Sequence, residues 1–339
     1  MLLNPEQNVT DHIEHNKRIW PISEKKGLLA MLNARGKSQN QLFEKARQIR
    51  FQSGMNFCLL RGVIEISNYC QKNCSYCAMR AANQSIHRYR MSVQEILDVA
   101  ERIVKTGITV IFLQGGQDPK MDPIVEKAIG EIKKKYNCSI ILCLGEKRPE
   151  TYQRFYSAGA DAYILKFETS DPALYRAIIH ADPQKRLQCI GQLQNVGYKI
   201  GVGNIIGLPD QTMDSICEDI LLSMKIRPDF VSCAPFIPNQ EVPLEHVPYG
   251  DLNTTLNWMA ICRILLKKCL IPSVSALEKI QKGAQLKGLN AGANVMTINF
   301  TPLQYRKKYS IYSKMRFVVS VDHALETAKK AGLNVILDK

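Results

Sequence analysis

The segment Arg61-Gly-Val-Ile-Glu-Ile-Ser-Asn-Tyr-Cys70-Gln-Lys-Asn-Cys74-Ser-Tyr-Cys77 joins a strand pattern directly to three closely spaced cysteines. Its first part, Gly62–Ile66, is a short apolar run typical of a buried β-strand. The cysteines follow with the spacing C-x3-C-x2-C. Such a loop suits three irons of one 4Fe-4S cubane and leaves the fourth iron without a protein ligand. An open iron indicates a site for chemistry rather than for electron storage alone.

Zinc is the alternative ligand for these three cysteines, and the spacing favours it less. Structural zinc sites typically use two C-x2-4-C or H-x3-5-H pairs that together complete a tetrahedron. No second pair of this kind lies near Cys70 to Cys77. The pattern therefore predicts an iron-sulfur cluster.

Length and composition limit the number of domains and allow a substantial core. With 339 residues and 45% hydrophobic residues, it can form one large α/β barrel or two ordinary domains. The start Met1-Leu-Leu-Asn-Pro-Glu-Gln has no basic segment followed by an apolar one, so a secretion signal is not expected. No apolar run reaches the roughly 18 residues of a membrane-spanning helix. We expect a cytoplasmic protein, because a reducing compartment suits eleven cysteines and an oxygen-sensitive cluster.

The charge balance is strongly basic, with a formal net charge of +14. This charge favours acidic partners, and a small acidic electron carrier is one of them. Nucleic acid is not expected as a partner, because the basic residues are spread along the chain rather than gathered in one tract with interleaved aromatic residues. A solvated basic surface without a specific partner is the remaining interpretation.

Repeated strand and helix patterns predict the fold class. From Arg61 onward, short apolar runs alternate with helical patterns, as in repeated βα units with a parallel sheet. Eight units over about 250 residues predict an α/β fold, a (β/α)8 TIM-type barrel with an N-terminal helical cap, whose catalytic loops gather at the carboxyl ends of the strands. The predicted strands are Gly62–Ile66, Thr109–Leu113, Ser139–Leu144, Ala162–Leu165, Lys199–Ile206, Phe230–Ala234, Ile271–Ser275 and Ala293–Thr297.

Three segments follow from these patterns. Residues 1–60 are predicted to form the helical cap, residues 61–312 the barrel, and residues 313–339 a C-terminal helix and tail that complete the barrel. Helix boundaries support the count: Ser92 opens a capping box with Glu95, Thr212 begins another helix, and Gly159 ends a third.

The cysteine spacing, with the aromatic residue Tyr76 before the third cysteine, resembles the radical S-adenosylmethionine (SAM) superfamily. In that superfamily the amino and carboxylate groups of SAM occupy the open iron, and an electron from the cluster cleaves SAM to a 5′-deoxyadenosyl radical that acts on a substrate in the barrel. The resemblance implies an enzyme with one 4Fe-4S cluster and SAM as cofactors. It gives Cys70, Cys74 and Cys77 the role of catalytic metal ligands.

Further motifs resemble the HydE family of FeFe-hydrogenase maturases, with biotin synthase and methylornithine synthase as relatives. The resemblance implies action on an iron-cysteine carbonyl-cyanide precursor of the hydrogenase cofactor. It also implies partners in cofactor maturation and an electron donor of flavodoxin or ferredoxin type. The motifs cover most of the chain from Arg61 to Tyr312. They are Arg61–Cys70, Arg88-Tyr-Arg-Met91, Leu113-Gln-Gly-Gly-Gln-Asp-Pro119, Phe167-Glu-Thr-Ser170, Gly207-Leu-Pro-Asp-Gln-Thr212, Pro235-Phe-Ile-Pro238, Gly292-Ala-Asn-Val295 and Asn299-Phe-Thr-Pro302.

The same resemblance assigns the SAM contacts. The turn Gly115-Gly116 would expose its backbone to the SAM amino group, and Glu168 with Arg186 would grip SAM through a carboxylate and a guanidinium. Tyr76 and Gln117 would also lie at the cofactor, and Ile205 with Ile206 would form an apolar wall against the adenine. Apart from the family resemblance, simpler interpretations apply. Gly115-Gly116 could be an ordinary strand-to-helix turn, Glu168 and Arg186 could be surface charges, and Ile205-Ile206 could belong to any buried parallel strand.

Five residues are predicted to line the substrate side: Gln114, Cys143, Lys166, Cys233 and Tyr305. Three departures from the family affect this prediction. The chain has Gln117 where the family usually has glutamate, and Lys166-Phe167 where the maturases have arginine and histidine. No cysteine follows Cys269, so the second cluster of some HydE proteins is not expected.

Other functions stay open at this point. The altered Lys166-Phe167 pair is consistent with a relative that acts on an organic substrate, by sulfur insertion of the lipoyl or biotin type or by an amino-acid rearrangement. A sulfur-donating cluster of the biotin synthase type is not expected, because its strand cysteines and arginine are missing here. A non-enzymatic scaffold that carries a cluster is another class, and the net charge of +14 leaves a nucleic-acid-modifying enzyme as a further option.

Overall fold

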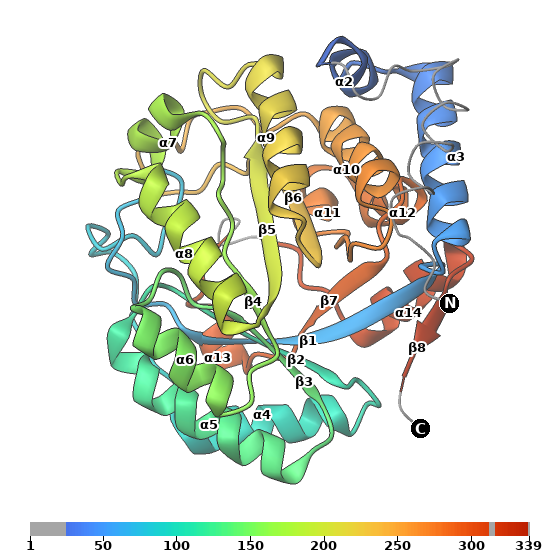
Figure 1. The fold of residues 1–339 in the computed structure, drawn as a ribbon. Coiled ribbons are helices and arrows are strands. Elements are labelled where there is room, and N and C mark those ends of the chain that lie inside the picture. The colour runs from blue at the N-terminus through green and yellow to red at the C-terminus, as the bar shows by residue number, and fades with distance from the viewer. Residues whose placement is uncertain (1–24, 312–315, 338–339) are drawn as a thin grey trace, which may run out of the picture.

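Eight parallel strands form one strongly curled sheet, and helices cover its outer side (Figure 1). The computed structural model describes residues 25–311 and 316–337. The hydrogen-bonded order of the strands is β6-β5-β4-β3-β2-β1-β7, with β8 paired to β1. The strands are β1 (Phe57–Ser67), β2 (Val110–Gly115), β3 (Ser139–Cys143), β4 (Ala162–Ile164), β5 (Lys199–Ile206), β6 (Phe230–Pro235), β7 (Val295–Asn299) and β8 (Asn334–Ile336).

The predicted fold class is confirmed, but one predicted strand is wrong. Residues 271–275 form no strand, because Pro272 has no backbone N–H to continue a ladder. This segment instead joins β6 to β7 through single bridges, Phe230 to Leu270 and Pro272 to Val295. Among the described residues, the bridges that link β6 and β7 through this segment lie only at the N-terminal ends of these two strands. The barrel is therefore closed only at the end where its strands begin.

The strand β8 lies outside the predicted set of eight strands, although its apolar sequence is visible near the C-terminus. It pairs with the first residues of β1, from Phe57 to Leu59. The first strand therefore begins four residues inside the segment 1–60. The three predicted segments stay a prediction, and residues 1–24 and 312–315 of those segments lie outside the described residues.

The helices follow the strands in sequence and lie around them (Figure 1). The predicted capping box at Ser92 and the helix start at Thr212 are confirmed, and both side chains accept a backbone N–H. The helices are α2 (Lys25–Leu32), α3 (Gly36–Gln52), α4 (Val93–Val104), the 3-10 helix η1 (Pro119–Met121), α5 (Asp122–Lys135), α6 (Pro149–Ser157), α7 (Pro172–Ile179), α8 (Pro183–Val196), α9 (Met213–Ile226), α10 (Leu252–Leu266), α11 (Ala276–Ile280), α12 (Ala284–Asn290), α13 (Leu303–Arg306) and α14 (Val321–Lys330).

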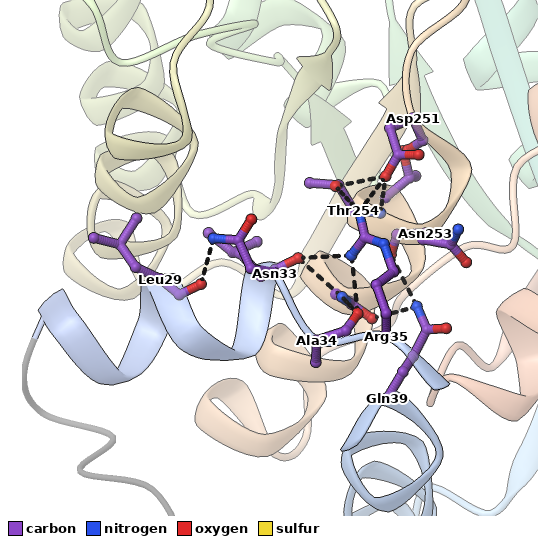
Figure 2. Close-up of polar contacts among 11 residues, drawn as sticks. Leu29, Asn33, Ala34, Arg35, Gln39, Asp251, Asn253 and Thr254 are labelled. Carbon is purple, nitrogen blue, oxygen red and sulfur yellow. Dashed lines mark hydrogen bonds and ion pairs between the residues drawn. The ribbon is translucent and has the colours of Figure 1, made fainter. Parts of the chain in front are cut away.

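The N-terminal helices are fastened to α10 by polar contacts at the turn between them (Figure 2). The Arg35 guanidinium lies 2.8 Å from an Asp251 carboxylate oxygen and donates to Thr254 Oγ1 at 3.1 Å. The buried Asn257 side chain donates to the carbonyl oxygens of Leu32 and Ala34, both at 2.9 Å. The helices α2 and α3 therefore pack on the helical layer of the barrel.

Side chains alternate between the two faces of the curled sheet. Along β1, Arg61, Val63 and Glu65 point into the barrel, whereas Ile64 and Ile66 pack in the core between strands and helices. A second apolar cluster fills the barrel interior near its base. It consists of Val63, Val110, Phe112, Ile141, Ala162, Ile164 and Phe230. The space above this apolar base is the position where parallel barrels carry their chemistry.

Within residues 25–311 and 316–337, none of the helices combines the length and the apolar character that crossing a membrane requires.

Candidate active site

A cavity of about 290 Å³ opens above the apolar base. Its polar and charged lining includes Arg61 and Glu65 from β1, Lys166 and Glu168 beyond β4, and Arg316 near the C-terminus. The cluster loop contributes Tyr76, Cys77 and Met79 to the same space. The cysteine motif and the charged side chains of the strands thus meet at one site.

The three cysteines follow β1 in a loop held by backbone contacts. Cys70 Sγ accepts backbone N–H bonds from Lys72 at 3.5 Å and from Gln117 at 3.3 Å. Burial and, after it, the neighbouring Cys70 raise the pKa of the Cys74 thiol to about 12. Burial and the other two thiols likewise raise the pKa of Cys77. Three thiols that affect one another, with N–H donors to one sulfur, fit a cluster with three protein ligands.

Arg88 fixes the end of the cluster loop. Its guanidinium donates to four backbone carbonyl oxygens at distances of 2.6 to 2.9 Å. These oxygens belong to Asn68, Met79, Arg80 and Asn83. These carbonyl groups lie before and after the three cysteines, so the Arg88 side chain holds both ends of the cluster loop together.

Gly116 lies directly against the cluster loop. A Cβ atom at this position would lie 2.2 Å from the Tyr69 carbonyl oxygen and 2.8 Å from Cys70 Cβ. These distances leave no room for a side chain, so the cluster loop itself requires glycine here. Gly115 is less restricted, with its nearest neighbour, the Ser67 carbonyl oxygen, at 3.3 Å.

Arg186 pairs with a carboxylate that we did not predict. Its Nε donates to Glu146 Oε1 at 2.8 Å, and the Lys72 ammonium lies 2.8 Å from Glu146 Oε2. Burial would raise the pKa of Glu146, but the charges and hydrogen bonds of Arg186 and Lys72 outweigh burial and lower it. Arg186 also donates to the Lys166 carbonyl oxygen. Its guanidinium is therefore held from two sides.

Glu168 has a backbone conformation that glutamate rarely adopts. Its φ is +65°, in the left-handed region, which costs about 1–2 kcal/mol. The surrounding backbone enforces it, because the Glu168 N–H donates to Gly203 O at 3.0 Å and the Glu168 carbonyl accepts from Ile205 N at 2.9 Å. The carboxylate lies 3.0 Å from the Lys166 ammonium. Strain of this kind is typical of a functional position.

Comparison with known proteins identifies the family. A family model described as "Radical SAM superfamily" matches residues 64–222. The FeFe-hydrogenase maturase subunit HydE of Thermotoga maritima is 38% identical over 282 residues, which are 83% of this chain and 81% of that protein. The chain belongs to the radical SAM superfamily. It is an enzyme of this superfamily, closely related to HydE, and its cofactors are a 4Fe-4S cluster and SAM.

Other relatives and solved structures agree with the barrel. The 3-methylornithine synthase of Methanosarcina acetivorans is 30% identical over 80% of this chain and 77% of that protein. The crystal structure of methylornithine synthase (PylB) superposes with a TM-score of 0.81 at 22% identity, covering 92% of this chain and 94% of that chain. The maturase HydG from Carboxydothermus hydrogenoformans gives a TM-score of 0.79 at 21% identity, with 97% and 80% covered. At these identities the two structures show the fold alone.

Most residues predicted from the sequence line the cavity or lie next to it. Six of the predicted cofactor and substrate residues line the cavity together with Cys77 and Glu168. They are Tyr76, Gly115, Ile205, Gln114, Cys143 and Lys166. Three further predicted residues are not part of this lining but contact neighbouring segments. Gly116 and Gln117 lie against the cluster loop, and Arg186 pairs with Glu146.

Three predicted residues lie elsewhere, and their placement is corrected. Cys233 is fully buried among side chains between sheet and helices, because its neighbours Ser232 and Ala234 face the cavity and side chains alternate along a strand. Ile206 points away from the cavity into the same core, unlike Ile205. Tyr305 stacks on Tyr89 with ring centroids 4.6 Å apart and donates to Glu95, outside the cavity lining.

The sequence did not reveal Glu65 and Arg316 as neighbours. They form a bidentate ion pair at the cavity, with Arg316 Nη2 donating to Glu65 Oε2 at 2.6 Å. Arg61, also unpredicted, donates to Thr297 Oγ1 at 2.7 Å. The available signal was the period of two along β1, which places Arg61 and Glu65 on one face of a buried strand.

Asp219 on α9 holds the backbone that follows Glu168. Its carboxylate accepts from Ser170 N at 2.6 Å and from Asn204 Nδ2 at 2.8 Å. Burial raises the pKa of Asp219 from 3.8 to about 7, despite these two bonds. The folded protein therefore binds this proton more tightly than the unfolded chain does. The associated stability is complete below about pH 4 and is lost as the pH rises through about 7.

We expect Asp219→Asn to remove this pH dependence. Between pH 5 and 8, the variant should gain stability relative to the parent by about 2–3 kcal/mol, from 1.36 kcal/mol per pH unit. The Asn204 side chain can turn its amide to meet the new donor. Urea unfolding at the two pH values checks this, with Asp214→Asn on the exposed side of α9 as the matched control. The prediction would be contradicted if the difference in unfolding free energy between the parent and Asp219→Asn were the same at pH 5 and pH 8.

Proposed function

We propose that this radical SAM enzyme is a maturase of HydE type that acts on a compact, charged iron complex, the iron-cysteine carbonyl-cyanide precursor of a hydrogenase cofactor. The cavity lining carries the proposal. Three basic residues, Arg61, Lys166 and Arg316, and two acidic residues, Glu65 and Glu168, face it above an apolar base. A small anionic complex needs such charge-assisted donors, whereas a long organic chain needs an apolar slot.

In this proposal Cys70, Cys74 and Cys77 hold the cluster and the turn at Gly115 approaches the SAM amino group. When bound, the cluster supplies the electron that cleaves SAM. Glu168 and Arg186 orient SAM through its polar groups, and Ile205 packs against its adenine. The strand ends and the cluster loop line this space together.

The relationship to 3-methylornithine synthase supports a second candidate, an amino-acid rearrangement. The Glu65 to Arg316 pair presents one carboxylate and one guanidinium to the cavity, and these two groups match the ammonium and carboxylate of a free amino acid. The same pair also serves a cysteine-bound iron complex. The two substrates must therefore be compared directly.

The comparison uses anaerobically reconstituted, reduced protein with SAM and either a synthetic iron-cysteine carbonyl-cyanide complex or free amino acids. We expect the iron complex to be consumed and to increase formation of 5′-deoxyadenosine several-fold. Consumption of an amino acid instead would favour the second candidate. If cluster-loaded protein forms no 5′-deoxyadenosine, a non-enzymatic cluster scaffold becomes the supported function.

Lys166 tests the charged lining. Lys166→Met removes one charge-assisted contact and should raise the substrate KM about tenfold or more. Because Lys166 is paired with Glu168, the SAM Kd of the variant is measured alongside. Lys185→Met, an exposed lysine on α8, is the matched control and should leave the KM unchanged. An unchanged KM for Lys166→Met would exclude this residue from the substrate site.

We further propose that the electron donor is an acidic protein of flavodoxin or ferredoxin type in the cytoplasm. The formal net charge of +14 supports it, because opposite charge accelerates encounter between partners.

A further inference from the structure

The loop after β3 carries a carboxylate that contacts both halves of the cofactor site. Glu146 is buried, and its carboxylate is shared between Lys72 of the cluster loop and Arg186 of α8. The side chains of Glu146 and Arg186 are 3% and 9% exposed, and that of Lys72 is 20% exposed. Nothing in the proposed contacts to SAM or to the cluster requires an acidic residue at this point, so its role calls for an explanation.

The backbone holds Glu146 in place independently of its charge. Gln117 Oε1 accepts from Glu146 N at 3.0 Å, and Gln117 N donates to Cys70 Sγ. The preceding Gly145 has a φ of +72°, and a Cβ there would lie 2.7 Å from Gln117 Cβ. The carboxylate thus has a fixed starting point between β2, β3 and the cluster loop.

Each oxygen of Glu146 serves a different part of the site. Oε1 accepts from Arg186 Nε at 2.8 Å, and Oε2 lies 2.8 Å from Lys72 Nζ. Lys72 stands between Cys70 and Cys74 in the chain. Arg186 continues to the Lys166 carbonyl, two residues before Glu168. One carboxylate therefore connects the cysteine loop to the strand end that carries the proposed SAM ligand.

We propose that Glu146 is a positioning residue that sets the cluster loop and Arg186 in one mutual arrangement, so that SAM affinity and cluster retention depend on the same carboxylate. The inference rests on the proposed role of Arg186 in binding SAM. Its physical basis is that a buried guanidinium and a partly buried ammonium without their shared anion adopt other positions or attract water. Residues that orient ligands from behind typically change affinity or activity about 10–100-fold.

The test compares Glu146→Gln with two other variants in the cluster-loaded protein. We measure the SAM Kd by equilibrium dialysis and the rate at which a chelator removes iron. Glu146→Gln should weaken SAM binding about tenfold or more and accelerate iron loss. Lys72→Met should accelerate iron loss with little change in SAM binding, because it alters only the loop half. Glu126→Gln, which removes a partly exposed carboxylate 3.1 Å from Arg154, should change neither quantity.

Two results would overturn the inference. In folded Glu146→Gln protein, an unchanged SAM Kd together with an unchanged rate of iron loss would reduce Glu146 to a structural residue. If that variant does not fold, Glu146→Asp shortens the side chain so that one carboxylate no longer reaches both cations, and unchanged values there would likewise reduce Glu146 to a structural residue. Arg186→Lys separates the two proposals. If Arg186→Lys leaves the SAM Kd unchanged, the proposed role of Arg186 in binding SAM is wrong. If Arg186→Lys weakens SAM binding while Glu146→Gln does not, only the proposed role of Glu146 is wrong.

Discussion

Replacing Cys74 by serine is expected to abolish 5′-deoxyadenosine formation, with a loss of at least about 100-fold, since even partners outside the ligand shell cost about 10–100-fold. A cubane held by three protein thiolates has no fourth cysteine in this loop to replace a missing one. The Cys74 thiol is also partly buried, and burial is the main cause that raises its pKa to about 12. A serine hydroxyl there binds iron less well than a thiolate.

Iron content and the cluster's visible absorption measure this effect directly, before any turnover. Cys138→Ala is the matched control, because Cys138 is a buried cysteine near the start of β3 and outside the cluster loop. It should keep its iron. Full iron content and full 5′-deoxyadenosine formation in Cys74→Ser would contradict the assignment of Cys74 as a ligand.

Gly116→Ala is expected to destabilise the protein without metal by about 1–3 kcal/mol, the usual cost of overpacking, and to lower its capacity for iron. The added Cβ would lie 2.2 Å from a backbone oxygen of Tyr69 and 2.8 Å from Cys70 Cβ. Neither atom belongs to a flexible side-chain end, so the cluster loop itself must move. Because Cys70 is at the contact, this movement displaces a cluster ligand.

Gly130→Ala in α5 is the matched control for the same chemical change. A Cβ at Gly130 meets nothing within 4 Å, and alanine in a helix interior is favoured over glycine by about 1 kcal/mol. This control should be more stable and should bind iron normally. Thermal unfolding of both variants and iron content after reconstitution check the contrast. Normal iron content in Gly116→Ala would mean that the loop tolerates the displacement.

The sequence alone predicted the features that depend on local spacing. The three-cysteine loop after a strand and the capping box at Ser92 follow from residues close together in the chain, and the structure has them as expected. Seven of the predicted strands are present because each is a short, mainly apolar run. The strand at 271–275 was mistaken because apolar character outweighed Pro272, which cannot continue a ladder.

Contacts between distant residues were decided only by the tertiary structure. The partners of the two predicted SAM contacts were not foreseen: Arg186 pairs with Glu146, 40 residues away, and Glu168 pairs with Lys166. Arg316 pairs with Glu65 across 251 residues.

Long-range pairs of this kind carry no periodic signal, because they depend on strand order and on the register of β1 to β3. The sequence by itself determined that this protein carries a cluster loop on a parallel barrel, since both arise from local spacing. The tertiary structure decided which charges meet around that loop, since only the closing of the barrel brings the strand ends together.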